Sequence, residues 1–266
     1  MPELPEIETI VRGLRPLVVG RRIVDYDTRQ PKAINLPIDS LRDRGCQAIR
    51  AVDRCGKSAI LRLETADLWL HLGLQGQALY DPPGAPRPAT QPMVTIALDD
   101  GARLRLEQIF MGHAHLLDLD ASAKRAASLG VDPLQNPTAE WLGDLAAKKP
   151  GLGCKAALMD QALVSGVGNA YSDEALHRAR LHPARKLSSL SPEEMATLWL
   201  AVREVLEESI ERGGDESYTD VAGRRGTFTS RVHGRKDCAT CGAPTVKQAF
   251  GGRSAYFCPK CQGSTG

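Results

Sequence analysis

The first residues of the chain, MPELPEIETI, place a proline and two glutamates where a helix is about to begin. Removal of Met1 would expose the secondary amine of Pro2. An α-amino group has a pKa of about 8, and a helix N-terminus lowers it further, so part of it is neutral near neutral pH. Such an amine can attack a carbonyl carbon and give an iminium ion, a strong electron sink. Glu3 and Glu6 lie three residues apart, on one face of the helix. Prolines and carboxylates also simply start helices, so both interpretations stay open.

Four of the seven cysteines form two CxxC pairs, and sixteen residues separate the pairs. They are Cys238, Cys241, Cys258 and Cys261. This spacing predicts a four-thiolate zinc site with a β-hairpin between the pairs. Four thiolates close the coordination sphere, so we expect one structural zinc ion that folds a short tail. Arg253 lies between the pairs and is well placed for phosphate contact.

The same end of the chain is basic. Residues 222–266 contain eight Lys or Arg and a single Asp, although the whole chain has a formal net charge of only +2. A basic module on a mildly acidic body is typical of proteins with a polyanionic partner. A solvated basic surface would explain the charge equally well.

The elements that position these residues differ between the two halves of the chain. Apolar spacing predicts a helix over residues 5–17. Alternating runs between turns of Gly, Pro and Asp then indicate strands at 59–64, 68–72, 94–98 and 102–106. No regular helix alternates with these strands, which favours an antiparallel sandwich.

The second half has helical patterns. We predict a helix over 158–164, a glycine turn at 165–169 and another helix over 170–176. Ser191-Pro-Glu-Glu supplies an N-cap, a first-turn proline and a glutamate at the third position, and Gly213-Gly214 ends that helix.

Composition excludes several classes of protein. Hydrophobic residues make up 42% and charged residues 25%, which is close to average globular usage. No apolar run approaches the roughly 18 residues of a membrane helix. The N-terminus lacks the basic-then-apolar order of a signal peptide, so we expect a cytoplasmic globular protein.

Five motifs, taken in order along the whole chain, resemble one family. They are MPELPEIE, Gly56-Lys57, His71-Leu-Gly-Leu-Gln-Gly, Leu158-Met-Asp-Gln with Gly166-Val-Gly-Asn, and the final RSAYFCPKCQ. Together they resemble the formamidopyrimidine-DNA glycosylase and endonuclease VIII (Fpg/Nei) family of base-excision repair enzymes. The resemblance implies an α+β fold of three domains: a catalytic β-sandwich flanked by helices (1–133), an all-α helix–two-turn–helix DNA-binding domain (134–228) and a zinc-finger β-hairpin (229–266).

The resemblance also implies a bifunctional DNA glycosylase and abasic-site lyase that needs no organic cofactor. By this resemblance, Pro2 attacks C1′ of the damaged nucleoside and the base leaves. Glu3 matches the residue that assists sugar-ring opening, and Glu6 matches a second carboxylate in the same pocket. Lys57 matches the lysine that holds the phosphate near the lesion. The abasic strand would then be cut by β-elimination or β,δ-elimination.

Other positions match the DNA-binding residues of the family. Asn169 and Arg253 match the pair that clamps the DNA backbone, and Lys155 matches a further phosphate contact. Leu74 and Phe110 match apolar wedges that fill the gap left by the flipped nucleotide. The implied partner is damaged double-stranded DNA, with no membrane. We expect a monomer in the bacterial cytoplasm, associated with the nucleoid.

One stretch departs from the family pattern. Where the formamidopyrimidine branch usually has Asp-Pro-Arg-Arg-Phe-Gly, this chain has Glu107-Gln-Ile-Phe-Met-Gly112, without either arginine. Selectivity for cytosine opposite the lesion, and with it the preferred lesion, therefore stays open. The alternatives are a catalytically weak damaged-DNA-binding protein of the same fold, or a glycosylase for oxidised pyrimidines or alkylated bases.

Overall fold

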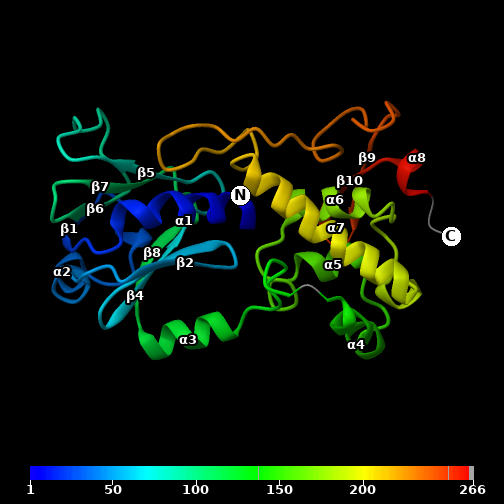
Figure 1. The fold of residues 1–266 in the computed structure, drawn as a ribbon, viewed down its shortest axis with the longest axis horizontal. Coiled ribbons are helices and arrows are strands. Elements are labelled where there is room, and N and C mark those ends of the chain that lie inside the picture. The colour runs from blue at the N-terminus through cyan, green and yellow to red at the C-terminus, as the bar shows by residue number, and fades with distance from the viewer. Residues whose placement is uncertain (137, 251, 264–266) are drawn as a thin grey trace. The chain divides into compact units, whose positions relative to one another are not determined.

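A computed structural model describes residues 1–136, 138–250 and 252–263. The chain divides into two compact units. The first comprises Met1–Ser128 and Arg212–Thr227, and the second comprises Leu129–Glu211 and Phe228–Gly266 (Figure 1). Residues 212–227 therefore leave the helical part of the chain and fold with the N-terminal part.

The first unit is built on two antiparallel four-stranded sheets, which confirms the predicted sandwich. The sheet orders are β1-β6-β7-β5 and β2-β3-β4-β8. The strands are β1 (Ile23–Thr28), β2 (Ala51–Cys55), β3 (Ser58–Arg62), β4 (Ala66–His71), β5 (Gln77–Asp81), β6 (Val94–Leu98), β7 (Arg103–Glu107) and β8 (His113–Asp118). Strand β6 has the predicted bounds, and β3, β4 and β7 lie within two residues of theirs.

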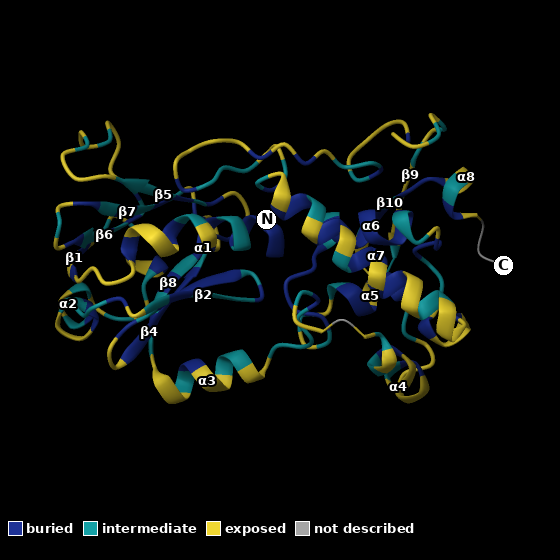
Figure 2. Ribbon diagram, in the orientation of Figure 1, coloured by how far each residue is buried: buried dark blue, intermediate teal, exposed yellow. Residues whose placement is uncertain are grey.

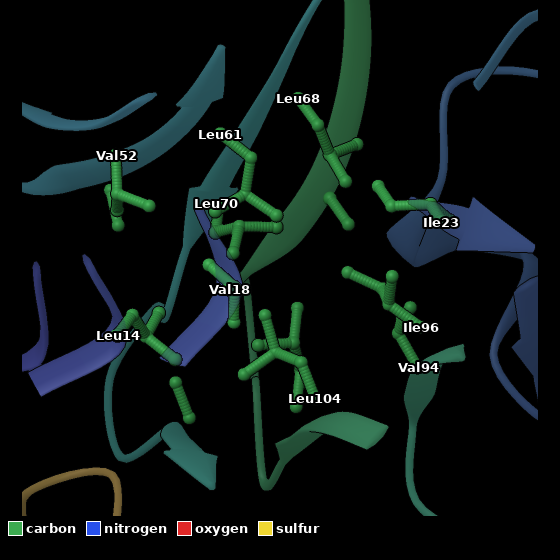
Figure 3. Packing of buried hydrophobic residues seen from close by; sticks show 14 of the residues in the cluster. Leu14, Val18, Ile23, Val52, Leu61, Leu68, Leu70, Val94, Ile96 and Leu104 are labelled. Carbon is green, nitrogen blue, oxygen red and sulfur yellow. The ribbon is translucent and has the colours of Figure 1, made fainter. Parts of the chain in front are cut away.

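One core joins both sheets to the first helix, α1 (Leu4–Val18). Alternating residues of β6 and β7 point inward, as their period-2 sequence patterns predict. Figure 3 shows Leu14 and Val18 of α1 beside Val52 and Leu61 from β2 and β3. This packing fixes the helix, and with it the N-terminus, against the sandwich.

Three shorter helical elements complete the first unit. They are η1 (Pro31–Ala33), α2 (Ile38–Gly45) and α3 (Leu119–Ala127). The side chain of Asp118 caps α3 by accepting from Ala121 N at 2.7 Å. Helix α3 contacts β4 and β8 along one edge of the second sheet (Figure 1).

The second unit is mainly helical and carries the hairpin that lies between the two CxxC pairs. Its elements are α4 (Glu140–Lys148), α5 (Cys154–Met159), α6 (Asn169–Arg178), η2 (Leu187–Ser189), α7 (Pro192–Glu211), β9 (Val246–Phe250), β10 (Arg253–Phe257) and α8 (Pro259–Gln262). Helix α7 begins at the predicted proline and ends before Gly213-Gly214. Figure 2 shows its buried and exposed faces alternating along its length. The mixed α+β class is thus confirmed.

The helix predicted over 158–164 is wrong. Helix α5 ends at Met159, and the chain turns at Asp160. The Asp160 side chain accepts from Ala162 N at 2.9 Å, while the Gln161 side chain binds Gly166 N and Val167 O. An aspartate that bonds its own downstream backbone competes with helix formation, and the apolar residues here pack within a turn instead.

No helix in the part of the chain that the structure describes has both the length and the apolar character needed to cross a membrane.

Candidate active site and metal centre

Helix α1 begins with a reciprocal capping box. Glu3 is the N-cap residue, and Glu6 at the third helical position accepts from Glu3 N at 2.8 Å. Both glutamates are buried, at 5% and 3% exposure. Two carboxylates are therefore fixed beside the first residues of the chain, as the three-residue spacing predicted.

Residues 212–227 fold onto the start of α1 within the same unit. Asp215 N donates to Glu6 Oε1 at 3.0 Å. At Gly214, where φ is +93°, an added Cβ would lie 3.3 Å from the Glu6 side chain. Glycine is thus required here for backbone conformation, and any side chain would crowd the glutamate.

The terminal amine lies in a pocket formed by these groups. Met1 N donates to the hydroxyl of Tyr218 at 2.7 Å. Burial lowers the pKa of the Met1 amine below its ordinary value; Lys57 acts in the same direction, while Glu3 and Glu6 partly offset the effect. Pro2 is buried directly behind Met1, so the amine that removal of Met1 would expose lies beside the same groups.

Lys57 enters the same pocket from the turn between β2 and β3. Gly56 makes this turn with φ of +55°. His71 on β4 lies with Nδ1 3.0 Å from Lys57 O, which places a proton on Nδ1. The pKa of His71 is lowered by burial. The structure therefore brings Lys57 together with Pro2, Glu3 and Glu6 in one unit.

His71 begins a row of stacked imidazoles across β4 and β8. The ring centroids of His71 and His113 are 5.2 Å apart, and those of His113 and His115 are 3.9 Å apart. Arg125 donates to His113 Nε2 at 2.9 Å. Burial, the neighbouring imidazoles of His115 and His71, and Arg125 lower the pKa of His113 to about 3. These rings are neutral at physiological pH.

The turn between β7 and β8 exposes apolar side chains. Phe110 is 64% exposed and Met111 71%, and Leu74 lies close by because its N–H donates to Phe110 O at 3.0 Å. Gln108 and Met111 have φ of +51° and +60°, which is unfavourable for residues with side chains. The predicted pair Leu74 and Phe110 is thus adjacent and exposed, and Met111 joins it although the sequence did not single it out.

In the second unit, Asn169 is the first residue of α6. Its Oδ1 is buried and has no hydrogen-bond partner within the described residues. The N-cap residue of this helix is Gly168, which has no side chain to cap it. At a helix N-terminus, the amide NH2 of the Asn169 side chain can donate to an anion such as phosphate.

Lys155 lies in the interior of the second unit. It is only 2% exposed, and its Nζ lies 2.5 Å from Asp173 Oδ1 and 3.3 Å from Asn169 O. A direct phosphate contact by Lys155 would require breaking this buried ion pair. The observed contacts instead connect Lys155 to the start of α6.

The four cysteines lie close together, with all sulfurs within 4.8 Å of one another. The Cys238–Cys261 and Cys241–Cys258 sulfur distances are 3.9 and 3.5 Å. Zinc–sulfur bonds of about 2.3 Å in a tetrahedron require sulfurs about 3.8 Å apart, so this set fits zinc. A hydrogen bond from Ala243 N lowers the pKa of Cys241 to about 7, which favours its thiolate.

Helix α6 holds the zinc region through its buried polar residues. Glu174 accepts from the backbone N–H groups of residues 231–233 at 2.7–3.0 Å. Asp173 accepts from Tyr256 N at 3.0 Å, and His177 Nε2 lies 3.3 Å from Cys238 Sγ. Arg253 is exposed at the start of β10. One helix thus presents Asn169 and supports the hairpin that presents Arg253.

Three family models match consecutive parts of the chain. The formamidopyrimidine-DNA glycosylase N-terminal domain matches residues 1–109, and the formamidopyrimidine-DNA glycosylase H2TH domain matches 129–220. The zinc finger found in FPG and IleRS matches residues 236–263. The matched segments follow the same order as the sandwich, the helices and the cysteine hairpin.

Individual relatives agree with the family models. Formamidopyrimidine-DNA glycosylase of Cytobacillus firmus is 38% identical over 98% of this chain and 100% of the relative. Formamidopyrimidine-DNA glycosylase of Salinispora arenicola is 39% identical over 98% of this chain and 96% of the relative. The solved structure of Lactococcus lactis Fpg with abasic-site DNA superposes with a TM-score of 0.87 at 27% identity, covering 98% and 100% of the two chains. The chain therefore belongs to the Fpg/Nei family of base-excision repair DNA glycosylases.

Proposed function

We propose that this protein is a bifunctional DNA glycosylase and abasic-site lyase that acts through the amine of Pro2. The observation that supports this best is the pocket at the start of α1. It contains the buried Pro2, two buried carboxylates and the nearby Lys57 ammonium group. Family membership and this set of groups favour the same chemistry.

In the proposed reaction, Met1 is removed and the Pro2 nitrogen attacks C1′ of the damaged nucleoside. The base leaves, and Glu3 transfers a proton to the ring oxygen so that the sugar opens to an iminium ion. Glu6 holds Glu3 N and Asp215 N and so fixes the pocket. The iminium acidifies C2′, and elimination then cuts the strand by β- or β,δ-elimination.

Binding of the damaged duplex would rest on phosphate contacts. A base inside a helix is unreachable, so the nucleotide must be flipped out at a cost of a few kcal/mol. We propose that Lys57, Asn169 and Arg253 hold phosphates and offset that cost. Leu74 and Phe110 would fill the gap in the stack. Lys155 would act through Asn169, whose carbonyl it contacts, rather than on phosphate.

We propose that the four cysteines hold one structural zinc ion. With four protein ligands the ion has no open position for substrate, so its contribution is to fold the hairpin that carries Arg253. We further propose a monomer that works on nucleoid DNA in the bacterial cytoplasm, with the three domains predicted above.

The lesion range follows from the exposed turn at residues 107–112. This turn offers Phe110 and Met111 and no arginine, so it lacks charged donors to read the base opposite the lesion. The Lactococcus lactis relative has been solved with DNA containing an oxidised pyrimidine and with DNA containing an N7-benzyl-Fapy-dG. We propose that oxidised or ring-opened bases are excised here with weak dependence on the opposite base.

The test is borohydride trapping on a duplex with one abasic site, using protein whose Met1 removal is verified by mass spectrometry. We expect a covalent adduct that Pro2→Gly abolishes and Glu3→Gln slows. A second preparation with residues retained before Pro2 should trap nothing, since an amide nitrogen has no available lone pair.

An adduct that survives in Pro2→Gly would contradict the proline mechanism. Tight binding of abasic DNA without any adduct would instead favour a damaged-DNA-binding protein with little catalysis. A panel of oxidised purines, oxidised pyrimidines and alkylated bases, each opposite all four bases, then ranks the lesions.

A further inference from the structure

Tyr218 is a residue of the pocket to which neither the sequence motifs nor the proposed mechanism gives a role. It lies in residues 212–227, which are held to the first unit by contacts that do not involve Met1. Tyr80 N donates to Val221 O at 2.8 Å, and Val221 belongs to the sandwich core. Asp215 N is held by Glu6. The position of Tyr218 is therefore fixed by contacts other than its hydrogen bond to Met1.

Its environment keeps the phenol protonated. Burial raises the pKa of Tyr218 well above its ordinary value, and the nearby carboxylates of Glu6, Glu3 and Asp215 raise it further. A neutral phenol is a hydrogen-bond donor as well as an acceptor. In the structure the hydroxyl accepts from the Met1 amine at 2.7 Å. With that amine gone, its proton is available for an acceptor.

Met1 is bonded to the Pro2 nitrogen through an amide, and in the reaction proposed above C1′ of the sugar would be bonded to the same nitrogen through an iminium. Both groups are planar because the carbon–nitrogen bond has double-bond character. The Met1 Cα then corresponds to C2′, the only carbon attached to C1′ in the opened sugar. The Met1 nitrogen, one bond further, corresponds to C3′.

This correspondence places the Tyr218 hydroxyl at the C3′ end of the sugar, next to the bridging oxygen of the 3′-phosphate. Resting on the function proposed above, we propose that Tyr218 is a catalytic residue of the elimination step that donates a hydrogen bond to the departing 3′-oxygen. It would act after the iminium has formed and not in forming it.

The step balances with the groups present. A carboxylate of the pocket takes the proton from C2′, and that electron pair forms the bond between C2′ and C3′ as the C3′–O3′ bond breaks. The electron pair of the broken bond leaves with the phosphate. Tyr218 keeps its proton, because a phosphate monoester is a stable anion, and stabilises the charge growing on O3′.

The experiment compares trapping with strand cleavage on the same abasic duplex, in single turnover with Met1-processed protein. We expect Tyr218→Phe to slow cleavage roughly 10- to 100-fold and to leave the trapping rate within about twofold, as for the loss of one donor to a developing charge. Tyr80→Phe, in the same unit but outside the pocket, is the matched control and should alter neither rate.

A substrate with sulfur in place of the bridging 3′-oxygen sharpens the test. Sulfur is a weak acceptor and a better leaving group, so the difference between Tyr218→Phe and the wild type should largely disappear. Equal slowing of trapping and cleavage, or normal cleavage, would overturn the role of Tyr218. An adduct formed by Pro2→Gly would instead overturn the proposed function, so the two failures are distinguishable.

Discussion

Helices α1 and α6 both begin at candidate binding groups, but their N-terminal caps differ. Helix α1 begins inside its own unit, where Glu3 and Glu6 cap it reciprocally and Glu6 also binds Asp215 N. The N-cap of helix α6 is Gly168, which has no side chain, and Asn169 Oδ1 has no hydrogen-bond partner in the described ranges. The N-cap of α1 therefore supplies a carboxylate, whereas the N-cap of α6 supplies backbone alone.

The difference fits the work proposed for each place. Chemistry at C1′ requires carboxylates held rigidly before substrate arrives, because reorganisation would add to the barrier. Phosphate binding requires hydrogen-bond donors, and the side-chain amide of Asn169 is one. The buried polar residues of α6 lie further along the helix, where Asp173 and Glu174 support the zinc region. The same helix is therefore rigidly attached at its middle, while the proposed phosphate contact lies at its first residue.

The largest predicted contrast is in stability. We expect Glu6→Ala to lower the free energy of unfolding by about 3 kcal/mol, since the buried Glu3 N–H and the partly buried Asp215 N–H lose a charged acceptor. Asn169→Ala should change it by less than about 0.5 kcal/mol, because its Oδ1 makes no hydrogen bond to the described residues. Urea titration of both variants gives the two values. Comparable losses would mean that Glu6 and Asn169 contribute equally to the free energy of unfolding.

Zinc removal should affect DNA binding by the second unit, which contains α6, and leave the start of α1 unchanged. Chelation releases the hairpin that Asp173 and Glu174 hold, and with it Arg253, so affinity for abasic duplex should fall roughly 10- to 100-fold, the value of one charged contact. Trapping at saturating DNA should stay within about twofold, since α1 belongs to the other unit. Titration by fluorescence anisotropy at fixed salt, with zinc restored as control, measures this. Loss of trapping at saturating DNA would contradict the expectation that zinc supports DNA binding and not the chemistry at the start of α1.

A charge placed at the start of α6 separates folding from binding. Asn169→Asp should stabilise the protein by about 0.3–1 kcal/mol, since a carboxylate suits a helix N-terminus. The same carboxylate repels phosphate, so DNA affinity should fall about tenfold. Melting and anisotropy measurements on Asn169→Asp and Asn169→Ala test both parts. Unchanged affinity in the aspartate variant would exclude phosphate from this helix start.

A further prediction concerns acid and the unit that contains α1. In the folded protein the pKa of His113 is lowered to about 3, so between about pH 6.5 and 3 the unfolded chain binds more protons. Stability should therefore fall as the pH drops below about 6.5. His113→Gln, which keeps an acceptor for Arg125, should flatten this fall. Urea titrations at about pH 7 and pH 5 compare the slopes, and parallel slopes would contradict the prediction.

The sequence predicts well those parts of the site whose residues lie close together along the chain. The CxxC pairs and the Glu3–Glu6 interval each fix a geometry within one turn or one hairpin, and the structure shows both. Strand β6 and helix α7 follow their local periodicity for the same reason. Local patterns such as these need no knowledge of the rest of the chain.

The residues that the sequence did not reveal depend on distant contacts. Tyr218 reaches the terminal amine from 217 residues away, and only the glycine pair at 213–214 marks the start of its segment. The resemblance predicts Lys155 as a phosphate contact, and its ion-pair partner Asp173 is revealed only by the packing of α5 on α6. Met111 is exposed by backbone angles that its residue type does not favour.

The hydrogen bond between the Met1 amine and Tyr218 has a practical consequence for anyone who makes this protein. In the proposed mechanism, a residue left in front of Pro2 would both block the nucleophile and occupy the position of the sugar, so such a chain would resemble a zymogen inhibited by its own first residue. A fusion whose protease leaves proline as the new first residue would switch the enzyme on at a chosen moment. Incomplete trimming, by contrast, would give preparations that differ in active fraction while looking equally pure and equally folded.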